Sequence, residues 1–270
     1  MIIDGHCHVT DIDEPVWGWK AFTGDDLIKI MDINFPVNGE LRIVDKAVIM
    51  PALGITAIPN TTFEEQHKHV VDMVRKYPDR FIGNMVLNPR LGVEEGVKYL
   101  EKLVREDNFR MVKLHPTMHN YWPNSPDLVY PIFEAARKLN IPVLIHTGEP
   151  PYSVPVLVAP LAKKFKDVPI IIAHLGTQKI CYADECVFMA QHHDNIFLET
   201  GWGVQPRLIE AVRTLGSTRL VLGSDTPPME IWSWVRPVEV LGWDPPLGVN
   251  LSTQEVENIL GDNLAKLMGI

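Results

Sequence analysis

Short apolar runs rich in β-branched residues alternate along the chain with longer segments of helical periodicity. Residues 143–145 and 170–173 are purely apolar, which is typical of parallel strands that are buried on both faces. The pattern predicts eight strands, at residues 2–6, 46–50, 81–87, 111–115, 142–146, 170–174, 196–200 and 220–225.

Helical segments lie between most of these strands. Apolar residues recur three or four positions apart in them and predict helices at residues 64–77, 93–105, 131–139, 154–165, 181–192 and 206–215. A last helix begins at Ser252 and continues towards Met268. Ser252 and Glu255, three residues later, have the spacing of a capping box at its start.

This alternation predicts one α/β domain over residues 1–270, folded as a closed (β/α)8 TIM barrel. An open, doubly wound sheet is the alternative, but the Gly-x-Gly-x-x-Gly turn typical of that fold does not follow the first strand. Three segments are longer than simple connections, at residues 9–36, 51–62 and 226–251. Each follows a strand, so all three should rise from the C-terminal rim of the barrel, where active sites lie.

Polar side chains stand at the ends of several predicted strands. Residues two apart in a strand point to the same side, so His6 and His8 present ring nitrogens to a common point. This pair alone is a weak indication of a metal site, and two incidental histidines would explain it equally well. Other predicted strands end in His115, His146, His174 and Asp225.

Strand ends of a barrel converge at one rim, although they are far apart in the sequence. Imidazole and carboxylate donors of this kind form catalytic zinc sites, in which one position stays open for water. The alternative is that these histidines satisfy hydrogen bonds within the core. Because polar groups at the ends of apolar strands are costly to bury, their repeated occurrence at one rim favours the metal site.

The sequence around these positions resembles the amidohydrolase superfamily, and specifically the amidohydrolase-related branch that includes aminocarboxymuconate-semialdehyde decarboxylase. The resemblance covers nearly the whole chain. It rests on Asp4-Gly-His6-Cys-His8, Val112-Lys-Leu-His115-Pro, Val143-Leu-Ile-His146-Thr-Gly, Ile172-Ala-His174-Leu-Gly, Gly223-Ser-Asp225-Thr-Pro and the C-terminal Ile259-Leu-Gly-Asp-Asn263.

The resemblance implies that His6, His8, His146 and Asp225 bind a divalent metal. It also implies that Asp225 exchanges a proton with the metal-bound water. His174 would contact the substrate or that water, or would bind a second ion as in two-metal members. These roles are chemically coherent, because a cation lowers the pKa of bound water, a carboxylate can take its proton and an imidazole can polarise a carbonyl. Asp225 and His174 are therefore the catalytic candidates.

Lys113 shares a face of its strand with His115, which we take to be the inward face. In two-metal members of the superfamily a carboxylated lysine at the end of strand four bridges the ions, and Lys113 could take that role. We favour the alternative, a cationic anchor for a substrate carboxylate. We expect one divalent metal, zinc, or two ions if Lys113 is carboxylated. Arg90, after the third strand, is a second candidate anchor, although a surface arginine explains it equally well.

The main hypothesis for function is hydrolysis of a small molecule, by attack of metal-bound hydroxide on an amide, ester or lactone. The alternative is non-oxidative decarboxylation of an unsaturated or aromatic carboxylic acid, because the resembled branch contains such enzymes with nearly the same ligands. A barrel that binds a metal or ligand without catalysis is a third hypothesis, which the presence of Asp225 disfavours.

Tryptophans gather in the predicted rim loops. We interpret them as an aromatic roof over the metal, suited to a flat or apolar part of the substrate. A loop core or an oligomer interface is an equally good interpretation, so a homo-oligomer stays open. Two histidines of the first predicted helix, His67 and His69, are expected to be solvated. The tryptophans are Trp17, Trp19, Trp122, Trp202, Trp232 and Trp234.

Composition excludes some classes of partner. The net charge of -9 argues against binding to nucleic acid or to an anionic membrane surface. Three cysteines without a Cys-x-x-Cys pair indicate a reducing compartment, and neither a signal segment nor a membrane-spanning apolar run is visible. We expect a cytoplasmic protein whose partner is a small-molecule substrate.

Overall fold

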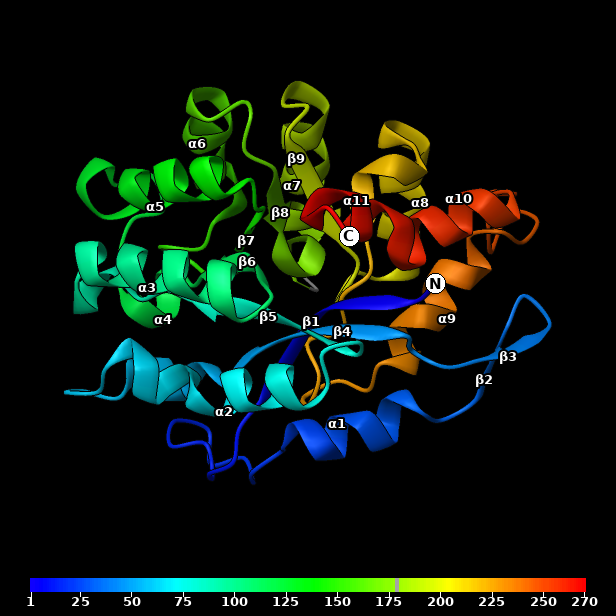
Figure 1. The fold of residues 1–270 in the computed structure, drawn as a ribbon. Helices are drawn as coiled ribbons and strands as arrows, with labels where there is room; N and C mark the ends of the chain where they lie inside the picture. Colours follow the sequence, from blue (N-terminus) through cyan, green and yellow to red (C-terminus); the bar gives the residue numbers. More distant parts are fainter. Residues whose placement is uncertain (178–179) are drawn as a thin grey trace.

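The computed structural model describes residues 1–177 and 180–270. Eight parallel strands form one sheet in which the order of the strands follows the order of the chain (Figure 1). Each predicted strand overlaps one of them, and the predicted α/β barrel is confirmed. The strands are β1 (Ile3–Val9), β4 (Lys46–Pro51), β5 (Phe81–Val86), β6 (Phe109–Leu114), β7 (Val143–Ile145), β8 (Ile170–Ile172), β9 (Ile196–Glu199) and β10 (Leu220–Val221).

The barrel closes where β1 meets the segment that follows β10. The backbone N–H of Asp225 donates to the carbonyl of His6, with an N···O distance of 2.8 Å. In the same seam the N–H of His8 donates to the carbonyl of Thr226, at 2.7 Å. These bonds place residues from the two ends of the chain side by side.

The side chain of Asp4 ties the same two segments together. Its Oδ1 accepts the backbone N–H of Ser224 at 2.9 Å and that of His6 at 3.1 Å. Complete burial raises the pKa of Asp4 to about 6. The next residue, Gly5, lets the strands approach closely, because a Cβ there would lie 2.9 Å from the carbonyl oxygen of Leu222.

Helices surround the strands (Figure 1). Among the predicted helices, the bounds of α5 differ most from the prediction, because it begins at Pro126 and has Pro131 inside it. Proline is favoured in the first turn of a helix, and Pro126 occupies that turn. The elements that confirm the predicted helices between strands are α2 (Phe63–Lys76), α3 (Val93–Glu106), α5 (Pro126–Leu139), η3 (Pro155–Val158) with α6 (Ala159–Lys164), α7 (Ile180–His192) and α8 (Gln205–Leu215).

The segment at residues 9–36 is more than a connection. Thr23 caps a helix there in a capping box with Asp26. The hairpin that follows turns at Asn38 and Gly39, with φ of 51° and 81°. Both motifs are readable in the sequence, although the prediction for residues 9–36 was only of a segment longer than a simple connection. The elements are α1 (Gly24–Met31), β2 (Phe35–Val37) and β3 (Glu40–Arg42).

Shorter helices complete the chain. Residues 253–268 form three consecutive helical segments, of which the middle one is a π-helix. Together they make up the predicted C-terminal helix. The short helices are η1 (Leu53–Ala57), η2 (Pro89–Leu91), α4 (Pro116–His119), η4 (Ala173–Gly176), η5 (Ser217–Arg219), α9 (Trp232–Val240), α10 (Thr253–Glu257), η6 (Asn258–Asp262) and α11 (Asn263–Met268).

Apolar side chains pack on both faces of the strands. One cluster combines strand residues such as Ile3, Val48 and Ile171 with Leu264 and Met268 of α11. A second and larger cluster lies between the strands and the surrounding helices. Burial on both faces explains why the strands read as continuous apolar runs.

His67 departs from the expectation of a solvated helix face. It is fully buried, and its Nδ1 donates to the carbonyl of Phe63 at 2.8 Å. Its Nε2 accepts the backbone N–H of Val86 in β5, at 3.0 Å. Burial lowers the pKa of His67 to about 4, so the ring is neutral and joins α2 to β5.

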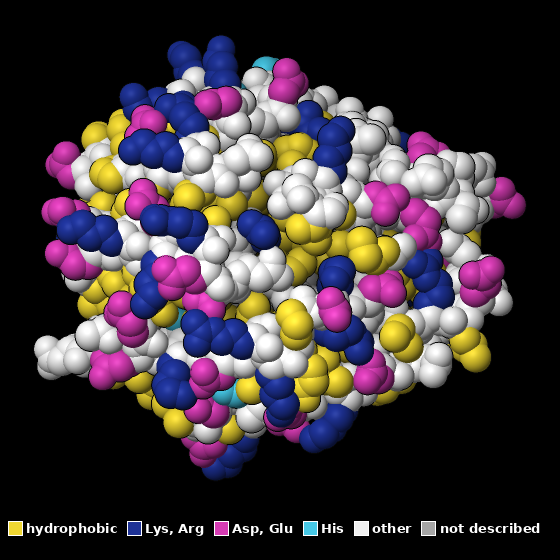
Figure 2. Space-filling view, viewed as in Figure 1, with side chains coloured by type: hydrophobic (Ala, Val, Ile, Leu, Met, Phe, Trp, Pro, Cys, Tyr) yellow, Lys and Arg dark blue, Asp and Glu magenta, His cyan; other side chains and the backbone are white. Residues whose placement is uncertain are grey.

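The surface mixes charges of both signs. Figure 2 shows acidic and basic side chains interspersed over the face in view. The two signs of charge are therefore not segregated on that face. Among the described residues, no helix combines the length and apolar character needed to cross a membrane.

The capping box of α10 provides a test of the fold. The hydroxyl of Ser252 accepts the backbone N–H of Glu255 at 3.3 Å, and the Glu255 carboxylate accepts the N–H of Ser252 at 2.9 Å. We expect Ser252→Ala to lower the free energy of unfolding in urea by about 1 kcal/mol, because one helix N–H loses its partner. Thr253→Ala, at an exposed neighbouring position, should change it by less than about 0.5 kcal/mol. Equal effects of the two variants would contradict the capping role.

Candidate active site

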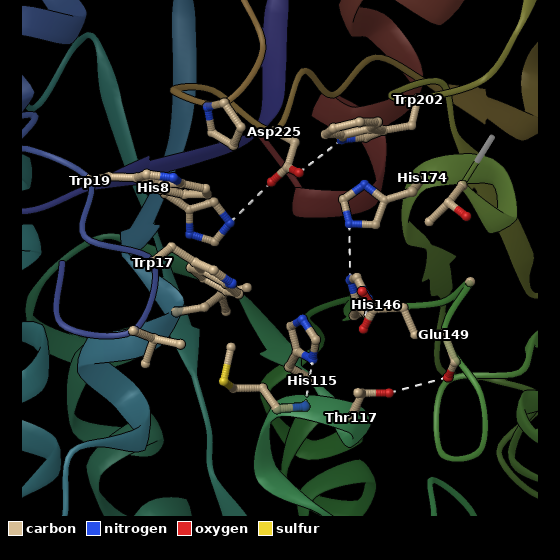
Figure 3. Close-up of a pocket in the computed structure, with 16 residues that line it drawn as sticks. His8, Trp17, Trp19, His115, Thr117, His146, Glu149, His174, Trp202 and Asp225 are labelled. Carbon is tan, nitrogen blue, oxygen red and sulfur yellow. Dashed lines mark hydrogen bonds and ion pairs between the residues drawn. The ribbon is translucent and has the colours of Figure 1, made fainter.

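A cavity of about 890 Å³ opens at the carboxyl ends of the strands. Its volume lies in the range of small-molecule sites. In Figure 3, Trp17 and Trp19 lie on one side of it and Trp202 and His174 on the other. The lining residues are His8, Val16, Trp17, Trp19, Leu53, His115, Thr117, Met118, His146, Gly148, Glu149, His174, Thr177, Trp202, Asp225 and Pro228.

Three predicted metal ligands meet beside this cavity. The Nε2 atoms of His6 and His8 are 3.2 Å apart. Asp225 Oδ1 lies 3.4 Å from the first and 3.3 Å from the second. His174 is also near, since one donor atom each of His6, His174 and Asp225 lie within 4.8 Å of one another. These side chains form a candidate divalent-metal site.

Hydrogen bonds on the far side of each ring indicate which nitrogen carries the proton of the neutral ring. His8 Nδ1 lies 2.8 Å from the carbonyl of Pro51, which can only accept, so this nitrogen carries the proton. His6 Nδ1 lies 3.0 Å from Glu199 Oε2 and donates to it. Both Nε2 atoms then present lone pairs to each other and to the carboxylate of Asp225. Such a convergence of acceptors is stabilised by a cation, so the donor set fits a metal.

Asp225 is held by contacts on both of its oxygens. Trp202 Nε1 donates to Oδ2 at 2.9 Å, while Oδ1 faces the histidines. The Trp202 N–H stabilises the ionised form of the carboxyl group, because it donates to a carboxylate oxygen. Asp225 is therefore an oriented carboxylate at neutral pH.

His174 and His146 form a second pair of rings. His174 Nε2 lies 3.1 Å from His146 Nδ1, and His115 stacks on His146 with ring centroids 3.7 Å apart. His146 Nε2 is 3.3 Å from Glu149 Oε2. Burial lowers the pKa of all three histidines, so their rings are neutral. The structure thus brings His146 against His174, and its role as a metal ligand stays a prediction.

Lys113 and Arg90 occupy different surroundings. Lys113 is fully buried, and its Nζ lies 3.2 Å from His6 Nε2. Burial lowers the pKa of Lys113 to about 8. Arg90 instead donates to the carbonyl of Asn120, at 2.7 Å. Neither Lys113 nor Arg90 is among the described residues that line the cavity. Their positions therefore give no support to the predicted role as substrate anchors.

Three of the six rim tryptophans line the cavity, and two of these, Trp17 and Trp19, stack with centroids 5.0 Å apart. Trp202 is the third, and its indole N–H also donates a hydrogen bond to Asp225. The predicted aromatic roof is therefore limited to three residues. The remaining tryptophans are the exposed Trp122 and the buried Trp232 and Trp234.

Thr177 lines the cavity and has a φ of 60°, and three residues of the candidate chemistry also have the positive φ that favours glycine. The φ angles are 67° for His174, 58° for Trp202 and 64° for Asp225. Such conformations cost about 1–3 kcal/mol each and persist where the surroundings impose them. All three side chains line the cavity, so the strained backbone coincides with the candidate chemistry.

Glu199 is a site residue that the sequence does not single out. At the end of β9, the sequence leaves open whether Glu199 or Thr200 faces inward, and the structure buries both. Glu199 Oε2 contacts His6 and also accepts the backbone N–H of His174 at 3.2 Å. Burial raises the pKa of Glu199. An acidic residue at the end of an apolar strand is the signal that could have identified it.

A family model described as amidohydrolase matches residues 3–270 of the chain. The comparison with curated proteins gave no match.

Solved structures share the fold over nearly their whole lengths. A presumed amidohydrolase from Staphylococcus aureus has a TM-score of 0.77 and 15% identity, with 100% of this chain and 99% of that chain covered. A 5-carboxyvanillate decarboxylase from Novosphingobium aromaticivorans, with bound manganese and 3-methoxy-4-hydroxy-5-nitrobenzoic acid, has a TM-score of 0.77 and 16% identity, covering 100% and 97%. A 2,6-dihydroxybenzoate decarboxylase from Rhizobium has a TM-score of 0.73 and 14% identity, covering 99% and 98%. At these identities the likeness shows the barrel fold.

The buried histidines predict a pH-dependent stability. Burial lowers the pKa of His6, His67, His115, His119, His146 and His174. Below about pH 6.5 the unfolded chain binds protons that the folded protein does not. The free energy of unfolding should therefore fall from pH 7 to pH 5, by up to about 1.4 kcal/mol per pH unit for each such histidine. Urea unfolding at several pH values measures this slope, and a flat profile would contradict it.

Proposed function

The chain belongs to the amidohydrolase family, and we propose that it is a metal-dependent decarboxylase of an aromatic carboxylic acid that needs no redox cofactor. One observation carries the proposal. The metal donors of His6, His8 and Asp225 lie beside a cavity that is lined by tryptophan side chains. The two decarboxylases of similar fold are named for aromatic acids, and one of them contains bound manganese.

In this proposal His6, His8 and Asp225 hold one metal ion, with His146 and His174 beside it. When bound, the metal would hold the substrate carboxylate and stabilise negative charge next to the breaking bond. Manganese is the first candidate, because the similar carboxyvanillate decarboxylase contains it. Zinc, which the donor types also suit, is the second.

The lining of the cavity supports an aromatic substrate with one carboxylate. The faces of Trp17, Trp19 and Trp202 offer flat apolar contact to a ring. Among the described lining residues, Glu149 and Asp225 carry side-chain carboxylates and none is Lys or Arg. These carboxylates would repel a second anionic group on the substrate. We therefore infer that the other substituents on the aromatic ring are uncharged.

Asp225 is the candidate proton carrier. Its carboxylate is ionised before the substrate binds, so it first takes up a proton from a water molecule, and the hydroxide left in solution later combines with the released carbon dioxide as bicarbonate. The carbon–carbon bond to the carboxyl group then breaks, carbon dioxide leaves, and the bonding electrons stay on the ring carbon. Asp225 gives its proton to that carbon, which completes the product. Trp202 orients the carboxylate during both transfers, and His174 donates to a substrate oxygen.

Hydrolysis is the second candidate, and the geometry of Asp225 and His174 supports it as well. Asp225 would take a proton from a water molecule, which attacks the carbonyl carbon of an amide, ester or lactone. His174 would stabilise the oxygen on which charge develops. The two candidates differ in the atom that receives the proton from Asp225, which is the ring carbon in decarboxylation and the leaving group in hydrolysis.

The metal content and the state of Lys113 can be measured together. We expect one equivalent of manganese or zinc per chain and an intact mass without carboxylation, since the Lys113 amine already contacts His6. Inductively coupled plasma analysis and native mass spectrometry give both values. His6→Ala should lose the metal while it keeps the circular dichroism spectrum of the wild type. Two equivalents, together with about 44 Da of added mass on Lys113, would instead support the bridged two-metal site.

Product analysis separates the two functions. Incubation of the metal-loaded protein with hydroxybenzoic acids should release carbon dioxide, while matched phenyl esters and anilides should stay intact. Asp225→Asn should lower the rate by at least about 100-fold, because the proton carrier is lost. Ester or amide cleavage without carbon dioxide release would contradict the decarboxylase proposal and support hydrolysis instead. The Asp225→Asn protein serves as the control for contaminating activities.

A further inference from the structure

A single buried oxygen of Glu199 joins the two histidines that flank the candidate metal. Glu199 Oε2 lies 3.0 Å from His6 Nδ1 and accepts the backbone N–H of His174 at 3.2 Å. His6 belongs to β1, and His174 stands just after β8. The last residue of β9 therefore holds one side chain and one strained turn, both of which belong to the site.

Two glycines enclose this carboxylate. A Cβ at Gly223 would lie 2.6 Å from Glu199 Oε1, and a Cβ at Gly201 would lie 2.5 Å from the same atom. Contacts this close are essentially never seen, so no larger residue fits at either position without movement of Glu199. The close approach of these two glycines leaves the carboxylate little room to rotate, so Oε2 points towards the histidines.

The contact determines which nitrogen of His6 is free. An imidazole that donates through Nδ1 presents an unprotonated Nε2, and a carboxylate partner makes that nitrogen a stronger ligand. The backbone N–H of His174 needs an acceptor as well, because the residue is buried. Glu199 meets both needs with one atom.

We propose that Glu199 is a positioning residue for the metal centre, which fixes His6 in the tautomer that offers Nε2 and holds the turn that presents His174. This inference rests on the metal site of the proposed function and applies equally to decarboxylation and hydrolysis. Glu199 itself does not line the cavity. It acts through the histidines and not on the substrate.

Glu199→Gln provides the test, because it keeps the size of the side chain and removes its charge. Manganese and zinc affinities are measured by competition with a chelator on the full chain, and we expect them to weaken roughly 10- to 100-fold. In parallel, the ¹⁵N shifts of His6 are measured in metal-free protein labelled at histidine, with the signal assigned by its loss in His6→Asn. The wild type should show the Nδ1–H tautomer, and Glu199→Gln should show a mixture of tautomers.

Glu239→Gln is the matched control. Glu239 is a buried carboxylate that accepts the backbone N–H of Asn38 at 3.0 Å and lies outside the cavity lining. Its substitution should leave the metal affinity and the His6 tautomer unchanged. An equal loss of affinity in both variants would show a general effect of removing a buried charge, and would overturn the proposal.

Further outcomes separate this inference from the proposed function. Metal affinity within about twofold of the wild type, with an unchanged His6 tautomer, would overturn the role of Glu199. If the wild type binds neither metal, the proposed metal site fails, and the tautomer comparison still decides whether Glu199 orients His6. If Glu199→Gln does not fold, Glu199→Asp carries the test, because its carboxylate is one methylene short. Weakened metal binding by a folded Glu199→Asp protein supports the proposal, and unchanged binding overturns it.

Discussion

The backbone hydrogen bonds between β1 and the segment after β10 are the contact on which the rest of the structure depends. They close the barrel, and they also set Asp225 against His6 and His8. Because these segments lie at opposite ends of the chain, the donor group exists only in the closed barrel. A cation bound there would favour the closed state over the unfolded chain, which cannot assemble the same ligands. Folding and metal binding should therefore be coupled.

The barrel could be predicted because its strands are buried on both faces and must be apolar throughout. The donors could be predicted because they interrupt such runs at the rim, where burial of an unpaired polar group is costly. His6, His8, His174 and Asp225 are each visible in this way, and the structure brings them together.

The parts that could not be predicted depend on partners from distant segments. His67 follows the helical period of Val70, Val71 and Val74, which places it on the buried face. Its polar ring nevertheless led to the prediction of a solvent-exposed side chain. The backbone N–H that donates to this ring belongs to β5, and the sequence of the helix does not reveal such a partner. Glu199 required the end of β9 to be known to within one residue, since a shift by one position turns a side chain to the other face.

The depth of Lys113 could not be read from alternation alone. Alternation predicts which face a strand residue takes but not how far its side chain reaches along the barrel. The structure places the amine against His6 and beneath the cavity, and complete burial lowers its pKa. The distinction matters for the chemistry, because a buried amine influences the metal ligands while an exposed one would bind the substrate.

The left-handed backbone at His174, Trp202 and Asp225 has a consequence for selection. Glycine would relieve the strain at each of these positions, and a search for thermostable variants by folding alone would accept it readily. Each such replacement would remove a side chain that faces the cavity. Stability and chemistry therefore favour different residues at these three positions.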